Sequence, residues 1–176
     1  MRVGKEKILF SDGAITRRVE ELADEIAAAP LKPEIAVAIL AGAFVFAADL
    51  LRALALRKLA LPVEFIRLCS VGETGRRGEV KVLIGPSEIV KDKHVLVIDG
   101  VLDSGATLAK ARELLNGAGA GSIKTAVAVA KHHPNRVIEA DYVGFEAGPE
   151  FLYGYGMDRA GSGRGLPDIR ITWGKC

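Results

Sequence analysis

Two aspartates follow an apolar run near the middle of the chain, and their spacing suits a phosphate site. Residues 95–98 are apolar, Asp99 comes directly after them, and Asp103 follows four residues later. Residues 104–107 then lead into a helical pattern. A strand, loop and helix start of this kind surrounds an anion with N–H groups, and the helix dipole favours negative charge there. Because a carboxylate repels phosphate, the acids must bind sugar hydroxyls, hold a metal ion or act as a base.

The loop after Asp103 has residue types that suit an anion cradle. Gly105 lets the backbone turn without a side chain in the way, and Ser104 and Thr107 add hydroxyl donors. An ordinary strand, turn and helix with polar turn residues is the alternative interpretation, since short motifs match by chance.

Apolar strands alternate with helical patterns, which predicts an α/β fold with a parallel central sheet flanked by helices. Ligands gather at the carboxyl ends of such strands, so residues 40–43, residues 99–107 and Lys131 are expected on one rim. The N-terminal residues and the late strands are expected to form a small hood. Helices are predicted from Ser11 or Asp12 onward, over 44–56 and over 107–115; strands are predicted over 35–40, 63–68, 80–84, 95–98, 123–130, 142–145, 151–155 and 169–173, with 80–84 pairing with 63–68.

Length, charge and cysteine content exclude several classes of protein. The 176 residues suit a single domain, residues 1–176, and the net charge of +2 indicates neither a nucleic-acid nor a membrane partner. The longest apolar run, residues 35–48, is too short to cross a bilayer. Cys69 and Cys176 form no disulfide framework or zinc motif, so a cytoplasmic location is expected.

Three segments together resemble one known family. Residues 95–108 resemble the loop of type I phosphoribosyltransferases that binds phosphoribosyl diphosphate (PRPP), with Asp103, Ser104, Gly105 and Thr107 in its Asp-Thr/Ser-Gly-x-Thr pattern. Residues 40–52 resemble the diphosphate loop of hypoxanthine phosphoribosyltransferases, and residues 140–158 resemble that family's purine-binding segment. The segments occur in the family's order and spacing, which favours the hypoxanthine/guanine branch.

The resemblance implies purine salvage, in which the phosphoribosyl group moves from PRPP to a 6-oxopurine, giving IMP or GMP and diphosphate. It implies Mg²⁺ as cofactor, PRPP and the purine as small-molecule partners, and a homodimer or homotetramer. Asp103 would be the general base, with a capping aspartate as the alternative. Lys131 would read the purine's exocyclic oxygen, with a solvated lysine as the alternative. Asp99 would bind the ribose and the metal ion, and Tyr142 would stack on the purine, whose hydrogen bonds the Val143 backbone would complete. The residues implied to bind the phosphate groups are Ser104, Gly105, Ala106 and Thr107 for the 5′-phosphate, and Ala41, Gly42 and Arg164 for the diphosphate.

Four positions depart from the family pattern. Gly100 replaces a second acid, Ala41 a lysine of the diphosphate loop, Val71 a tyrosine of the closing loop, and Pro149 an acid near a second magnesium. The first interpretation is an active enzyme with low turnover. The second is an inactive homologue that binds a purine nucleotide as a sensor or interaction module. Retention of Asp103, the phosphate loop and Lys131 favours the enzyme. The preferred purine, the number of metal ions and the closure of residues 71–78 stay open.

Overall fold

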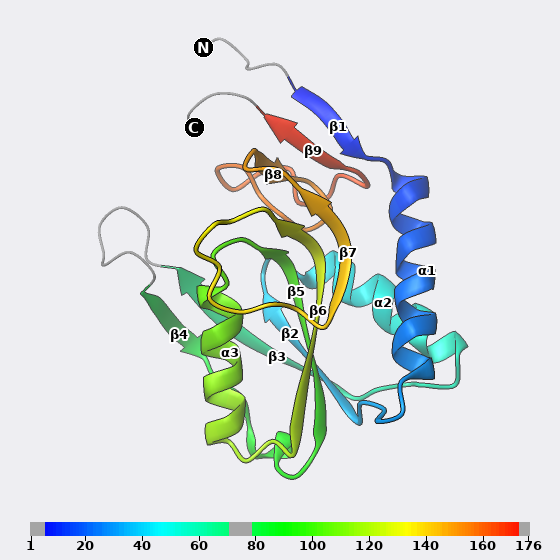
Figure 1. Ribbon diagram of the computed structural model, residues 1–176, viewed down its shortest axis with the longest axis vertical. Coiled ribbons are helices and arrows are strands. Elements are labelled where there is room, and N and C mark those ends of the chain that lie inside the picture. Colours follow the sequence, from blue (N-terminus) through cyan, green and yellow to red (C-terminus); the bar gives the residue numbers. More distant parts are fainter. Residues whose placement is uncertain (1–5, 71–78, 173–176) are drawn as a thin grey trace.

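The central element of the fold is a six-stranded sheet in the order β4-β3-β2-β5-β6-β7 (Figure 1). The computed structural model describes residues 6–70 and 79–172. Neighbouring strands are parallel except for β3 and β4, which form the antiparallel pair expected from the sequence. The strands are β2 (Ile35–Leu40), β3 (Val63–Ser70), β4 (Val80–Ile84), β5 (His94–Leu102), β6 (Ser122–Lys131) and β7 (Tyr142–Ala147).

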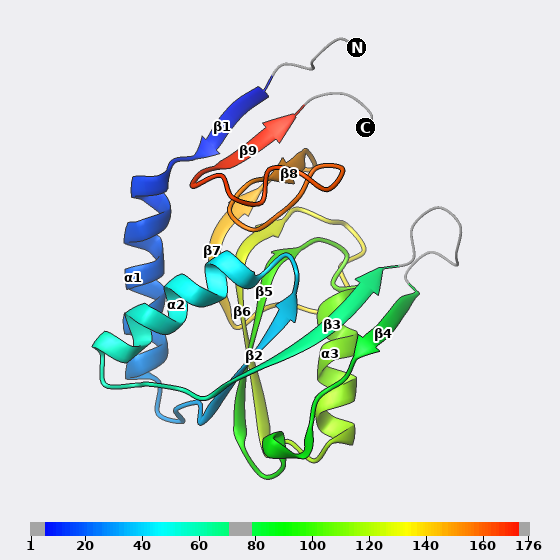
Figure 2. The ribbon, with the colours of Figure 1, turned by 180° about the vertical axis from the view of Figure 1, so that it is seen from behind.

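Helices cover both faces of this sheet, as the continuous apolar strands predict. Helices α1 (Asp12–Ala28) and α2 (Phe44–Leu56) lie on one face, and α3 (Ala106–Gly117) lies on the other (Figure 2). Side chains alternate along β2 and β5, so Ala36 and Leu96 pack with α1 and α2, whereas Val37 and Val97 pack with α3. Ser11 caps α1 by accepting the N–H of Ala14, as predicted.

A second, three-stranded sheet forms the predicted hood above the carboxyl end of the central strands (Figure 1). It pairs β1 (Glu6–Phe10) with β9 (Ile169–Thr172), and β9 with β8 (Phe151–Tyr153). A short 3₁₀ helix (Glu88–Val90) precedes β5. No helix among the described residues is both long and apolar enough to cross a membrane.

Element boundaries differ from the predictions at a few ends. Strand β8 stops at Tyr153 because Gly154 and Tyr155 take positive φ values of 93° and 49°, which extended strands do not allow. Helix α3 begins one residue before the predicted Thr107. Val71, the closing loop at 71–78 and Trp173 lie outside the described residues.

Candidate active site

Two cavities with shared walls lie at the carboxyl edge of the central sheet. The hood cavity has a volume of about 460 Å³ and extends up to strand β8. The loop cavity, of about 360 Å³, lies over the segment between β5 and α3. Asp99, Asp103 and Thr107 line both. The other walls of the hood cavity include Ala41, Gly42, Lys131 and Arg164, and those of the loop cavity include Ser104, Gly105 and Ala106.

The loop between β5 and α3 presents donors to the loop cavity. Gly105 has a φ of 86°, and a Cβ atom there would lie 2.8 Å from Cγ2 of Ile138, so both conformation and space require glycine. Helix α3 starts at the next residue, Ala106, without a side-chain cap. Because first-turn N–H groups lack intrahelical acceptors, this helix start is suited to bind an anion.

The predicted base and the predicted purine-reading lysine form an ion pair. Nζ of Lys131 lies 2.9 Å from Oδ2 of Asp103. The Lys131 side chain is only 13% exposed, so the solvated-lysine alternative is wrong. Lys131 ends β6, and its carbonyl oxygen accepts a hydrogen bond from the Arg136 guanidinium, which fixes the strand end.

Asp99 is a buried acid that faces both cavities. Its Oδ1 accepts the N–H of Gly100 at 2.7 Å. Burial outweighs this hydrogen bond and raises the pKa of Asp99 to about 7. No cationic side chain among residues 6–70 and 79–172 forms an ion pair with it, and its carboxylate is therefore suited to substrate hydroxyls or a bound cation.

The wall expected to hold diphosphate combines residues 41 and 42 with Arg164. The Arg164 guanidinium donates to the carbonyl oxygen of Gly156 at 2.7 Å and pairs with Oδ1 of Asp158 at 2.6 Å. It is thus held at the hood cavity and does not extend freely into solvent. The Gly42 carbonyl oxygen packs so closely that a Cβ atom at Gly100 or Gly156 would lie 2.7 or 2.6 Å from it, respectively.

Tyr142 and Val143 do not lie in this site, which corrects the prediction that they bind the purine. Tyr142 pairs with Ala126, five residues before the strand end at Lys131, and this distance is about 16 Å along a parallel strand. Tyr142 lines a separate small cavity with His94, and the Val143 carbonyl oxygen accepts a hydrogen bond from Arg18.

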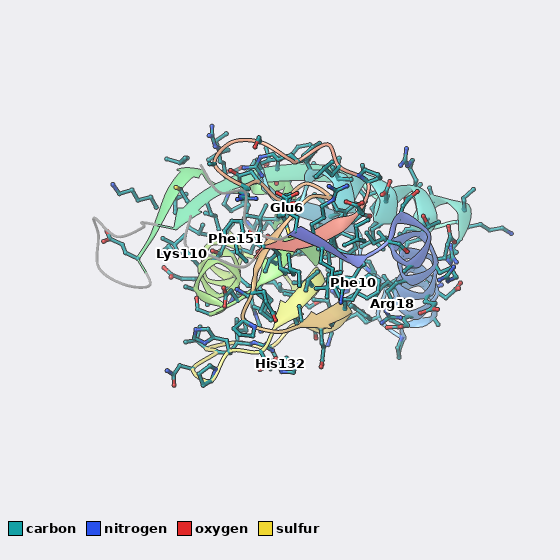
Figure 3. All side chains as sticks on the ribbon, turned by 90° about the horizontal axis from the view of Figure 1, so that it is seen from above. Glu6, Phe10, Arg18, Lys110, His132 and Phe151 are labelled. Atoms are coloured by element: carbon teal, nitrogen blue, oxygen red, sulfur yellow. The ribbon has the colours of Figure 1, made fainter. Side chains whose placement is uncertain are left out.

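The hood supplies the side chains that sequence reasoning missed. Phe151, Leu152, Met157 and Asp158 line the hood cavity, and Phe151 remains 42% exposed. Figure 3 shows Phe151 near the centre of the molecule, seen from above. Pro149, which replaces an acid of the family pattern, is not part of the wall, and Asp158 supplies a carboxylate there. The position of each aromatic residue relative to β7 could have distinguished them. Phe151 follows the carboxyl end of β7, where ligands bind, whereas Tyr142 begins that strand.

Comparison with known proteins identifies the family. A family model described as a phosphoribosyl transferase domain matches residues 7–160. A hypoxanthine-guanine phosphoribosyltransferase of Aquifex aeolicus is 36% identical, covering 98% of this chain and 97% of its own length. One from Dictyostelium discoideum is 34% identical, covering 97% of each. The solved structure of Trypanosoma cruzi hypoxanthine phosphoribosyl transferase has a TM-score of 0.87 and 31% identity, covering 98% of this chain and 93% of that one. The chain therefore belongs to the phosphoribosyltransferase family, in its hypoxanthine-guanine branch.

Proposed function

We propose that this protein transfers the phosphoribosyl group of PRPP to hypoxanthine or guanine, giving IMP or GMP and diphosphate in purine salvage. The observation that carries the proposal is the pair of cavities with Asp99, Asp103 and Thr107 in their common wall. One cavity suits the 5′-phosphate, the other suits the base and the diphosphate, and the ribose then lies between them. A cytoplasmic location stays a prediction from the sequence.

Asp103 and Lys131 act on the purine in this proposal. Asp103 takes or shares the proton of the imidazole ring while a ring nitrogen attacks the anomeric carbon. Lys131 donates to the 6-oxo group. The 2.9 Å contact between them places a base and a donor side by side, as the adjacent edge atoms of a 6-oxopurine require. Phe151, the exposed aromatic of the hood cavity, takes the stacking role expected of Tyr142.

The phosphate groups of PRPP occupy the two ends of the site. The 5′-phosphate lies on the N–H and hydroxyl groups of residues 104–107, and the diphosphate lies against Ala41, Gly42 and Arg164. Ala41 contributes no charge, so Arg164 is the cation that the described residues supply to this wall. A bound diphosphate would compete with Asp158 for it.

The residues present suit a magnesium ion carried by the substrate. Among the described residues no cluster of three or more histidine, cysteine or acidic side chains could hold a metal ion by itself. Asp99, which pairs with no cationic side chain in the described part of the chain, offers the hard oxygen ligand that Mg²⁺ prefers. The ion offsets charge on the departing diphosphate when it is bound.

A spectrophotometric assay tests the function. Purified protein is incubated with PRPP, Mg²⁺ and hypoxanthine, guanine or xanthine, and IMP and GMP binding is measured by calorimetry on the same batch. Turnover that requires both PRPP and Mg²⁺ is expected. Tight nucleotide binding without turnover would instead support the alternative function, an inactive homologue that senses or displays a purine nucleotide.

Removal of the lysine should reduce discrimination between purines. We expect Lys131→Ala to lower kcat/KM for hypoxanthine and guanine roughly 10–100-fold, because a donor to the 6-oxo group is lost, and to leave the low rate with adenine nearly unchanged. Steady-state kinetics with the three bases measures this. Lys110→Ala is the matched control, because Lys110 pairs with Glu113 on the α3 surface. If the ratios of kcat/KM between the purines are the same in the wild type and in Lys131→Ala, Lys131 does not contact the base.

The protein is further proposed to form a homodimer, or a tetramer of two such dimers, through an edge patch of Leu56, Val63, Phe65 and Ile84. These side chains are 80%, 42%, 45% and 51% exposed, respectively. Along β3, Val63 and Phe65 lie on the face opposite to the buried Ile66. Arg67 lies on the same face as Phe65 and pairs with Ile84 of β4, so Val63, Phe65 and Ile84 share one face of the sheet. A second copy of this patch would bury these side chains against each other.

Charge in the edge patch should dissociate the assembly. Phe65→Glu is expected to weaken association on the order of 100-fold, because the carboxylate would be desolvated between copies. Sedimentation velocity over a concentration series measures this, with Ile8→Glu as control, since Ile8 is 49% exposed on the hood. Unchanged mass for Phe65→Glu would exclude this patch as the interface.

A further inference from the structure

The loop cavity has a wall that the sequence did not predict. Residues 132–141 follow β6 and return over the segment between β5 and α3, and His133 lines the cavity beside Ser104 and Thr107. The remaining side chains of that wall are acidic, hydroxyl-bearing or apolar. Among the described residues that line it, His133 alone has a basic side chain.

Contacts on both sides of the histidine hold this loop against the cradle. Before it, the N–H of His132 donates to the carbonyl oxygen of Ala147 at 2.8 Å. After it, the N–H of Val137 donates to the carbonyl oxygen of Ser104 at 3.0 Å. Ile138 fills the space above Gly105. His133 is therefore attached to the same backbone that forms the cradle.

One ring nitrogen of His133 has a backbone partner. The N–H of Asn135 donates to Nδ1 at 3.2 Å. A nitrogen that accepts an N–H carries no proton, so the proton of the neutral ring lies on Nε2. No described residue forms a hydrogen bond with Nε2. The turn thus presents an N–H donor from the wall of an anion cavity.

We propose that His133 binds the 5′-phosphate of PRPP and of the product nucleotide through Nε2. This inference depends on the proposed function, since that function places the 5′-phosphate in the loop cavity. The cradle then combines uncharged N–H and hydroxyl donors from one loop with a single ring donor from another. His133 contributes to substrate affinity and to preference for phosphorylated ligands, and takes no part in proton transfer to the purine.

His132 provides a matched control. It is the preceding residue and the same type, its side chain is 71% exposed, and its Nε2 lies 3.8 Å from Glu146. It does not line the loop cavity. Figure 3 places it at the outer edge of the molecule. Loss of either ring perturbs the same turn, but only loss of His133 removes a group from the cavity.

Calorimetry with GMP and guanosine on full-length protein tests the inference. For His133→Ala we expect GMP affinity to fall about tenfold or more, as for loss of a hydrogen bond to a charged group. Guanosine, which lacks the phosphate, should bind as it does to the wild type. His133→Gln, which retains an N–H donor, should restore part of the GMP affinity, and His132→Ala should match the wild type with both ligands.

Four results would overturn the inference. GMP affinity unchanged in His133→Ala would show that the ring does not touch the phosphate. Equal losses for GMP and guanosine, or an equal loss in His132→Ala, would show that the turn acts through structure alone. Wild-type protein that binds neither ligand would overturn the proposed function and this inference with it, so the wild-type measurement distinguishes the two failures.

Discussion

Asp103→Asn is expected to lower kcat roughly 10²–10⁴-fold, the usual contribution of a general base. Asparagine has nearly the same shape and still offers an oxygen to Lys131, which now lies 2.9 Å from the carboxylate. It cannot take the proton of the purine ring. The change therefore removes the chemistry while the walls of both cavities stay in place, and IMP or GMP should still bind.

Steady-state rates at saturating PRPP and purine measure the loss, and calorimetry with GMP measures the retained site. The melting temperature serves as the control for folding, because Lys131 is largely buried and loses a charged partner in this variant. Turnover equal to that of the wild type would mean that Asp103 is not the base. Loss of turnover together with loss of GMP binding would indicate that the ion pair between Asp103 and Lys131 is needed to form the site.

Gly100→Asp, the second large effect, is expected to weaken PRPP binding and to lower stability by about 1–3 kcal/mol, the usual cost of overpacking. From the sequence alone, restoring the missing acid would tighten PRPP binding if the site lacks nothing but that charge. The structure argues for the opposite result, because a Cβ atom at this position would lie 2.7 Å from the Gly42 carbonyl oxygen and 3.0 Å from its carbon. Both atoms are backbone, so the diphosphate wall itself must move. A second carboxylate beside Asp99 would also disfavour ionisation of either acid.

Thermal unfolding and the KM for PRPP test this prediction, with two companion variants. Gly100→Ala adds the Cβ atom without the charge, and it should reproduce most of the loss. Gly117→Ala, where a Cβ atom meets nothing within 4 Å, should not lower stability. Tighter PRPP binding in Gly100→Asp would contradict this prediction. It would show that residues 41–43 move to accommodate the new side chain, and that the wild-type site lacks only the negative charge of the second acid.

Local patterns predicted the elements that position the site, because those patterns act over a few residues. Neighbours in sequence determine the cap at Ser11 and the turn at Gly105. The two faces of the sheet determine the alternation of side chains along β2 and β5. The position of residues 104–107 and Lys131 at one edge was therefore predictable, since strand ends of a parallel sheet meet there.

Residues placed by tertiary packing were not predictable in this way. Tyr142-Val143 and Phe151-Leu152 are both pairs of an aromatic and an apolar residue, and only their distance from the end of β7 separates them. The role of Gly100 depends on Gly42, which lies 58 positions earlier and reaches it through packing of two strand ends. His133 faces the loop cavity because Val137 and Ile138 attach its turn to the phosphate loop, a contact that no local pattern encodes.

The hood can be completed only late in synthesis of the chain on the ribosome. Its strand β1 is synthesised first but pairs with β9, the last described strand, and β8 joins only through β9. The strands of the central sheet, β2 to β7, are all synthesised before β8 and β9. A growing chain can therefore form the proposed phosphate cradle before the hood strands that cover the proposed base site are complete. Until β9 is synthesised, the apolar side chains of β1 and β8 lack their partner strand.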